Sequence, residues 1–178
     1  MAMISNWLGA MLGNVWLTVF LGVLSTAIFS FVCPAMIRAV TTNRTVAPKI
    51  LDEYIMTWTP ADAEHLYSAL GPQGRVAYQN YYLRLDFWFP VLSLTLFYIG
   101  LISLAFPKGT PLAWLNLTPV LLYLSDWAEN LNHFMMAKLY PNLPAFSLRF
   151  GPVFSFLKWV LIFAFLLLAI AGFVIRVL

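Results

Sequence analysis

Four stretches of the chain are almost continuously apolar, and each is long enough to cross a bilayer as a helix. A spanning helix needs about 20 mostly apolar residues. The four stretches cover residues 15–40, 85–106, 112–139 and 152–177. The pattern therefore predicts an all-α, polytopic membrane protein, a four-transmembrane-helix bundle that forms a single transmembrane domain over residues 1–178.

The segment between the first and second spans predicts one further helix, over residues 60–70. Thr59 is a good N-cap and Pro60 suits the first helical position, while Gly71 and Pro72 are typical of a helix end. The apolar residues of this helix recur on one face: Leu66, Tyr67 and Leu70. We expect an amphipathic interfacial helix that lies on the membrane surface.

Composition supports a membrane protein and indicates its orientation. Of the 178 residues, 62% are apolar and only 10% are charged, whereas soluble domains carry about 25% charged residues. The net charge of +3 comes from basic residues that are spread along the chain, so no nucleic-acid partner is expected. Most of them lie near the side of the long loop, which predicts that this loop faces the cytoplasm or the matrix across a bacterial or organellar inner membrane. The N-terminus has no basic region typical of a removable signal peptide, so we expect the first span to be retained.

The third predicted span carries a polar arc in the middle of an apolar segment. Its members are Asp126, Glu129, Asn130 and His133, at positions i, i+3, i+4 and i+7. Residues at this spacing share one helix face. A charged carboxylate at the centre of a bilayer costs about 2.5–3.5 kcal/mol. The arc therefore needs either a compensating partner or a chemical task.

Charged residues of the neighbouring segments are predicted to reach the same depth. The second span enters the membrane from the basic side, which brings Asp86, Arg84 and Arg75 near His133, and Arg38 ends the first span at a similar level. We expect one or more of Arg38, Arg75, Arg84 and Lys138 to balance the two carboxylates of the arc. Tyr78 is assigned to the same network.

Several functions are compatible with such a pocket. It can be a buried network that fixes helix packing, an acid–base site, a metal site or part of a proton path. Glu129 and His133 could face one ion, but His133 is the only histidine within the spans, so we expect no metal and no cofactor.

Two hypotheses about function remain open at this point. The first is a non-catalytic subunit of a larger membrane protein complex in an energy-transducing inner membrane, whose partners are membrane lipids and other membrane protein subunits. The alternative is a small intramembrane enzyme that acts on a lipid or isoprenoid, with Asp126 or Glu129 as proton donor and His133 or Asp86 as its partner. The sequence leaves open whether this protein is an enzyme.

Overall fold

The computed structural model describes residues 2–35 and 49–178, and all regular secondary structure in these two ranges is helical. The α-helices are α1 (Ala2–Leu12), α2 (Val15–Ala27), α4 (Pro60–Ala77), α5 (Arg84–Asp86), α6 (Pro90–Ala105), α7 (Val120–Leu139) and α8 (Ala145–Val177). Two π-helical segments, η1 (Ile28–Val32) and η3 (Tyr78–Leu83), and two 3₁₀ segments, η2 (Leu51–Glu53) and η4 (Ala113–Leu117), complete the described structure. The all-helical class predicted from the sequence is confirmed.

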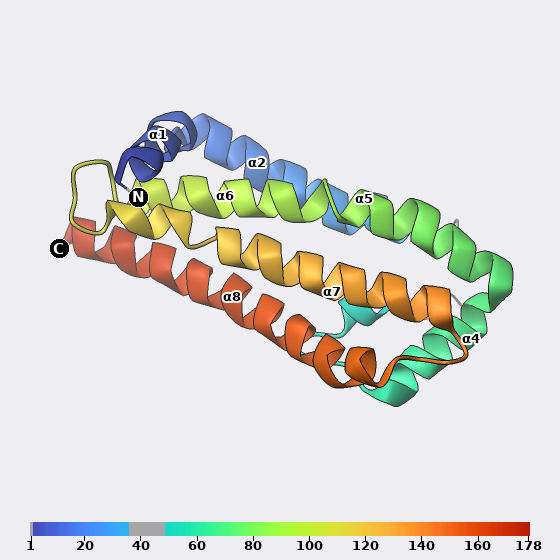
Figure 1. Ribbon diagram of the computed structural model, residues 1–178. Helices are drawn as coiled ribbons and strands as arrows, with labels where there is room; N and C mark the ends of the chain where they lie inside the picture. The colour runs from blue at the N-terminus through green and yellow to red at the C-terminus, as the bar shows by residue number, and fades with distance from the viewer. Residues whose placement is uncertain (1, 36–48) are drawn as a thin grey trace.

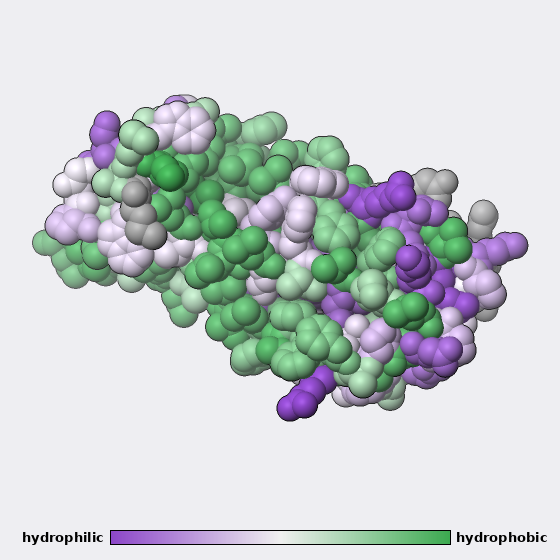
Figure 2. All heavy atoms as spheres, in the orientation of Figure 1, coloured by the Kyte–Doolittle hydropathy of each residue, from purple (hydrophilic) through white to green (hydrophobic). Residues whose placement is uncertain are grey.

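The long helices run side by side along one axis of an elongated molecule (Figure 1). Helix α7 packs against α8, α2 packs against α6, and α6 also contacts both α7 and α8. Both chain ends lie at one end of this bundle, and α4 lies at the other (Figure 1). The hydrophilic side chains gather at the α4 end, while the middle of the visible face is hydrophobic (Figure 2).

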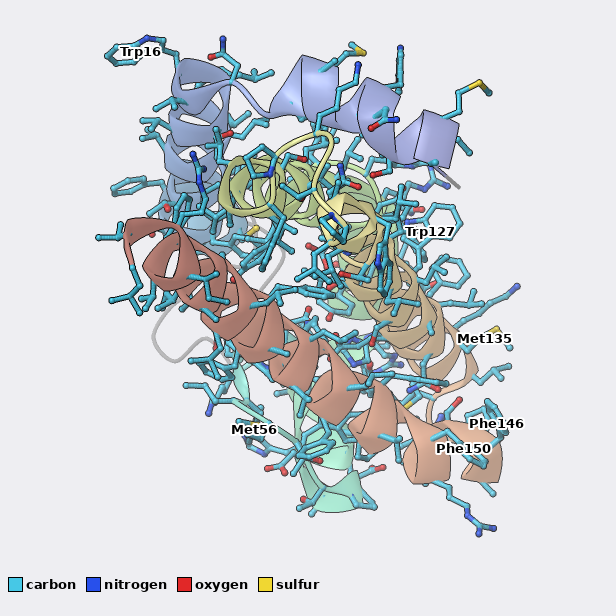
Figure 3. All side chains as sticks on the ribbon, turned by 90° about the vertical axis from the view of Figure 1, so that its left-hand side faces the viewer. Trp16, Met56, Trp127, Met135, Phe146 and Phe150 are labelled. Carbon is cyan, nitrogen blue, oxygen red and sulfur yellow. The ribbon has the colours of Figure 1, made fainter. Side chains whose placement is uncertain are left out.

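Three described helical stretches are long and apolar enough to cross a membrane: Val15–Ala35, Pro60–Ala105 and Ala145–Val177. Much of their surface is apolar and turned outward, as is expected where lipid is the solvent. Figure 3 shows Trp16, Met135 and Phe146 on the outside of the bundle, and Trp16 is 83% exposed. These stretches correspond to the predicted first, second and fourth spans, whereas α7 does not reach their hydropathy because of its polar residues.

Two helix boundaries differ from the sequence prediction. Helix α7 begins at Val120 rather than near residue 112, because the preceding residues form the short segment η4. Helix α8 begins at Ala145 and continues through Pro152, where a start was predicted. A proline costs a helix one backbone hydrogen bond, but it does not end this one. Residues of the predicted first span beyond Ala35 lie outside the described residues.

The predicted helix over residues 60–70 is the first part of α4. The Thr59 hydroxyl accepts from the Asp62 backbone N–H, and the Asp62 carboxylate accepts from the Thr59 backbone N–H, which is a complete capping box. Gly71, with φ of 63°, takes the left-handed conformation that ends this part. The chain then re-enters a helix, so the amphipathic segment and the second apolar stretch are joined with only a kink between them.

Two apolar clusters lie on either side of the polar arc along α7. Met136 belongs to the cluster at the α4 end, together with Leu51, Trp58, Leu66 and Tyr67. Leu122 belongs to the other, which also contains the following residues of α6 and α8: Tyr98, Ile102, Ala105, Phe106, Phe165 and Ala169. Asp126 to His133 therefore lie between two closely packed apolar regions.

Candidate functional site: a buried cluster of charges beside an apolar cavity

The four polar residues of the arc all face the interior of the bundle. Asp126 is 6% exposed, and Glu129, Asn130 and His133 have no exposed surface. Asn130 donates from Nδ2 to the Asp126 carboxylate at 2.9 Å. The spacing on α7 thus produces a single buried polar face, as the sequence indicated.

Lys158 of α8 supplies the positive charge at this face. Its ammonium lies 3.5 Å from a carboxylate oxygen of Asp126 and forms a closer ion pair with Glu129. A third ion pair, of 3.4 Å, joins Lys158 to Asp52. Removing charges from water is expensive, and an opposite charge at this distance recovers much of the cost. One lysine therefore bridges three carboxylates from two segments of the chain, α7 and η2.

Asp52 comes from η2, a segment in which the sequence pattern identified no functional residue. Its carboxylate contacts Lys158 and also lies 3.7 Å from Nδ1 of His133. The neighbouring Leu51 is fully buried in the apolar cluster at the α4 end, and its packing there holds η2 against the bundle. A lone Asp-Glu pair in an aperiodic loop gives no signal of burial, which is why Asp52 was missed.

Trp58 and Ser155 hold Glu129 from the other side. The indole N–H of Trp58 donates to the Ser155 hydroxyl at 2.9 Å, and that hydroxyl donates to Glu129. The Trp58 ring also lies 6.0 Å from the ring of His133, measured between centroids. This relay fixes the orientation of the Glu129 carboxylate toward Lys158.

The close approach of these groups depends on Gly151 of α8. A Cβ atom at this position would collide with the Asn132 amide of α7 and with the Trp58 ring. The absence of a side chain at Gly151 therefore allows α7, α8 and Trp58 to meet.

Among the described residues, Arg75, Arg84 and Lys138, which were predicted as partners, form no ion pair with Asp126 or Glu129. Arg75 instead donates to the Tyr67 carbonyl oxygen at 2.8 Å and lies over the Tyr140 ring, and Arg84 is exposed. Lys138 is also exposed. Helix rotation explains the difference, because the sequence gives the depth of a basic residue but not the direction in which it points. Arg38 lies outside the described residues.

Asp86 and Tyr78, the other predicted members, are both buried. Asp86 is 5% exposed and Tyr78 has no exposed surface. Tyr78 lies in the cluster at the α4 end, where its ring packs edge-on against Tyr67. Asp86 lines a cavity together with Asp126, as described below.

Three residues of the buried cluster of charges, Asp52, Glu129 and His133, carry side-chain atoms that commonly bind metal ions. Ligand atoms of Asp52, Glu129 and His133 lie within 4.8 Å of one another, and within the described residues neither nitrogen of His133 has a hydrogen-bond partner. The Lys158 ammonium already contacts two of these three residues. A metal ion would have to displace it, so the arrangement favours lysine as the cation of this site.

A partly enclosed cavity of about 350 Å³ lies beside the cluster. The charged residues on its wall are Asp52, Glu53, Asp86, Asp126 and Lys158, whereas Glu129 and His133 do not line it. The rest of the wall is mostly apolar and includes Phe29, Cys33, Val91, Leu94, Leu122, Trp159 and Ile162. Its size is at the lower end of the range of about 300–1,000 Å³ that is typical of small-molecule sites. Chemically, this is a mostly apolar cavity with a charged part of its wall, in which Asp86 and Asp126 supply carboxyl groups from two different helices.

Comparison of the chain with protein-family models, with curated proteins and with solved structures finds no match.

Proposed function

We propose that this protein is a small intramembrane enzyme that moves a proton on a lipid-soluble substrate. The observation that carries the proposal is the cavity of about 350 Å³ whose mostly apolar wall holds the carboxyl groups of Asp86 and Asp126, beside the charged residues Asp52, Glu53 and Lys158. Apolar pockets with a few convergent polar groups are the usual form of a substrate site. A lipid-soluble substrate is the kind of molecule that such a cavity would meet in a protein surrounded by lipid.

The two carboxyl groups suit acid and base roles. In an apolar cavity two neighbouring carboxyl groups disfavour simultaneous ionisation, so one of them tends to hold a proton that it can deliver. In the proposed step Lys158 stays paired with Asp52 and Glu129, while Asp126 is in its protonated form. The Asp126 carboxylic acid then donates its proton to one carbon of a substrate double bond. The Asp86 carboxylate then removes a proton from a neighbouring carbon, which shifts the double bond and leaves Asp86 protonated. A later proton exchange returns the pair to its starting state, and no oxidant or reductant is needed.

Deuterium incorporation tests this proposal even while the substrate is unidentified. The purified protein is placed in nanodiscs with a membrane lipid extract in D₂O, and lipids are analysed by mass spectrometry. We expect enzyme-dependent uptake of deuterium at carbon, and we expect Asp126→Asn and Asp86→Asn to abolish it. Glu64→Gln is the matched control, because Glu64 is an exposed carboxylate that accepts from the Tyr140 hydroxyl. Uptake no greater than in empty nanodiscs, or full activity of Asp126→Asn, would contradict the proposal.

A second candidate is the non-catalytic subunit of a larger inner-membrane complex. The observation in its favour is that Lys158 forms ion pairs with Asp52, Asp126 and Glu129, so much of the charge is balanced without a ligand. In this case the network serves helix packing and lipid holding. Extraction of native membranes in mild detergent should then bring the chain out in a large complex, whereas a lone chain with turnover would exclude this candidate.

Both candidates share one proposed arrangement in the membrane. In addition to the three apolar stretches, α7 crosses the bilayer as a fourth span, with its polar face covered by α8. The part of α4 over residues 60–70 lies on the surface of the cytoplasmic or matrix side, and the polar end of the molecule in Figure 2 supports this side for α4. Single cysteines at Glu64 and Lys108, in a Cys33→Ser background, should be labelled from opposite sides of sealed vesicles by a membrane-impermeant reagent. Labelling of both from one side would contradict the four-span arrangement.

A further inference from the structure

The charges on the cavity wall are not balanced among the described residues. Four acidic residues, Asp52, Glu53, Asp86 and Asp126, lie on the wall, and Lys158 is the one basic residue among the described residues that line it. Lys158 forms its ion pairs with Asp52, Asp126 and the deeper Glu129. Asp86 forms no ion pair with any residue in the ranges 2–35 and 49–178. Among the described residues, the cavity wall therefore carries more acidic than basic side chains. Asp86 is hydrogen-bonded to the Asn130 side chain but has no cation of these residues within ion-pair distance.

Asp86 is buried in apolar surroundings, where an acidic side chain has little contact with water. Its side chain is 5% exposed, and Val91, Leu94 and Leu122 lie on the same cavity wall. A carboxylate in apolar surroundings gains strongly from a cation that comes close to it. Two aromatic side chains, Phe29 and Trp159, also line the cavity, and aromatic faces attract cations.

We propose that the cavity binds a lipid-soluble amine, with the protonated nitrogen against Asp86 and the apolar body against Phe29, Leu94 and Trp159. This inference rests on the proposed function in taking the cavity as the substrate site. It adds that the site selects positive charge. In the reaction proposed above, protonation of a double bond forms a carbocation, and the same carboxylates would stabilise it. A protonated amine bound in the cavity places its positive charge near the same carboxylates as the carbocation does, and so it mimics that intermediate.

Binding of matched probes tests the inference. N,N-dimethyloctylamine and the uncharged 1-octanol, which has the same alkyl chain, are titrated at neutral pH into the protein in nanodiscs of uncharged lipid, with empty nanodiscs as the blank. We expect the dissociation constant of the amine to be lower than that of the alcohol by at least about tenfold, because a charge-assisted hydrogen bond in a buried site contributes about 1.5–3 kcal/mol. Equal affinities of the two probes would overturn the inference.

Three variants identify the site. Asp86→Asn should bring the two dissociation constants close together, whereas Glu64→Gln, which removes a carboxylate outside the cavity, should preserve the preference for the amine. Leu94→Trp fills the cavity without changing its charge and should weaken binding of the amine by a similar factor of about ten or more. Leu94→Trp also keeps the test decisive if Asp86→Asn does not fold. An amine preference that survives Asp86→Asn, or amine binding that survives Leu94→Trp, would overturn the inference.

The two proposals can fail separately. Deuterium uptake without amine preference would overturn the inference and leave the proposed function intact. Amine preference without deuterium uptake from any lipid extract would contradict the proposed function and leave a binding protein for cationic amphiphiles.

Discussion

Helices α7 and α8 pack along one another, yet they owe their places in the bundle to different residues. The buried face of α7 is largely polar, with Asp126, Glu129, Asn130 and His133 at its centre. Helix α8 is apolar over most of its surface and buries one cation, one aromatic residue and several small residues: Lys158, Phe165, Ser147, Gly151, Ser155, Ala169 and Gly172. Both helices turn leucine and other apolar side chains outward.

The difference shows what a helix needs in order to belong to such a bundle. Helix α8 can be recognised by hydropathy alone, and α7 cannot. In apolar surroundings, polar groups are tolerated where they contact one another, and on α7 they contact Lys158 and Ser155 of the neighbouring helix. The polarity of α7 is thus matched by a few residues of α8. Two changes test how far this match stabilises the fold, and two further changes test contacts outside it.

Removal of the cation should have the largest effect. Lys158→Met leaves Asp52, Asp126 and Glu129 without their common ion pair. We expect the free energy of unfolding to fall by about 3–5 kcal/mol, because breaking a buried pair leaves uncompensated charge. Thermal unfolding in detergent, followed by circular dichroism, measures the change.

A second substitution checks that charge, and not shape, is responsible. Adding Glu129→Gln to Lys158→Met removes one of the orphaned charges and should recover part of the lost stability. Lys108→Met, at an exposed loop position, is the control and should have little effect. Equal stability of Lys158→Met and the wild type would show that the lysine does not hold α7 and α8 together.

Close approach of the two helices is tested by Gly151→Ala. The added methyl group would collide with Asn132 and Trp58, both of which are buried. We expect a loss of about 3 kcal/mol, the upper end of the usual cost of overpacking. Gly9→Ala is the matched control, since its new Cβ would lie at an ordinary 3.5 Å from the nearest atom, the Asn116 amide nitrogen. A larger loss for Gly9→Ala than for Gly151→Ala, in the same thermal unfolding assay, would contradict this account.

The polar face of α7 followed from the sequence, because 3.6-residue periodicity is a local property. The partner of this face, Lys158, did not follow from the sequence, because it lies close to the start of the span predicted over residues 152–177. Helix α8 begins earlier, at Ala145, and this places Lys158 well inside the helix, level with Glu129. The direction of Arg75 and Arg84 depends on helix rotation, and the position of Asp52 depends on long-range packing of an aperiodic segment. Neither of these is encoded in local sequence pattern.

The interruption between α5 and α6 gives a smaller test of the same principle. The helix is interrupted at residues 87–89, directly before the proline at position 90, which has no backbone N–H to donate. The indole N–H of Trp127 of α7 donates to the Phe87 carbonyl at 2.8 Å. Trp127→Phe keeps a ring but removes this donor, so we expect a loss of about 1–2 kcal/mol. In Trp159→Phe the lost N–H has no hydrogen-bond partner among the described residues, and a loss as large as that of Trp127→Phe would contradict the role given to the hydrogen bond.

The smallest effect is expected at the N-cap of α4, which lies at the polar end, away from the seam between α7 and α8. Thr59→Ala removes the hydroxyl that accepts from the Asp62 backbone N–H and donates to its carboxylate at 2.6 Å. The expected cost is about 1 kcal/mol, typical of a lost cap. Thr59→Ser keeps the hydroxyl and should retain most of the stability. Because this end of the helix is exposed, hydrogen exchange should show the loss mainly in the first turn of α4, with the amides of α7 and α8 unchanged. Faster exchange throughout α7 would mean that α4 and the charged cluster unfold as one unit, which would extend the cooperative region beyond the pair of helices.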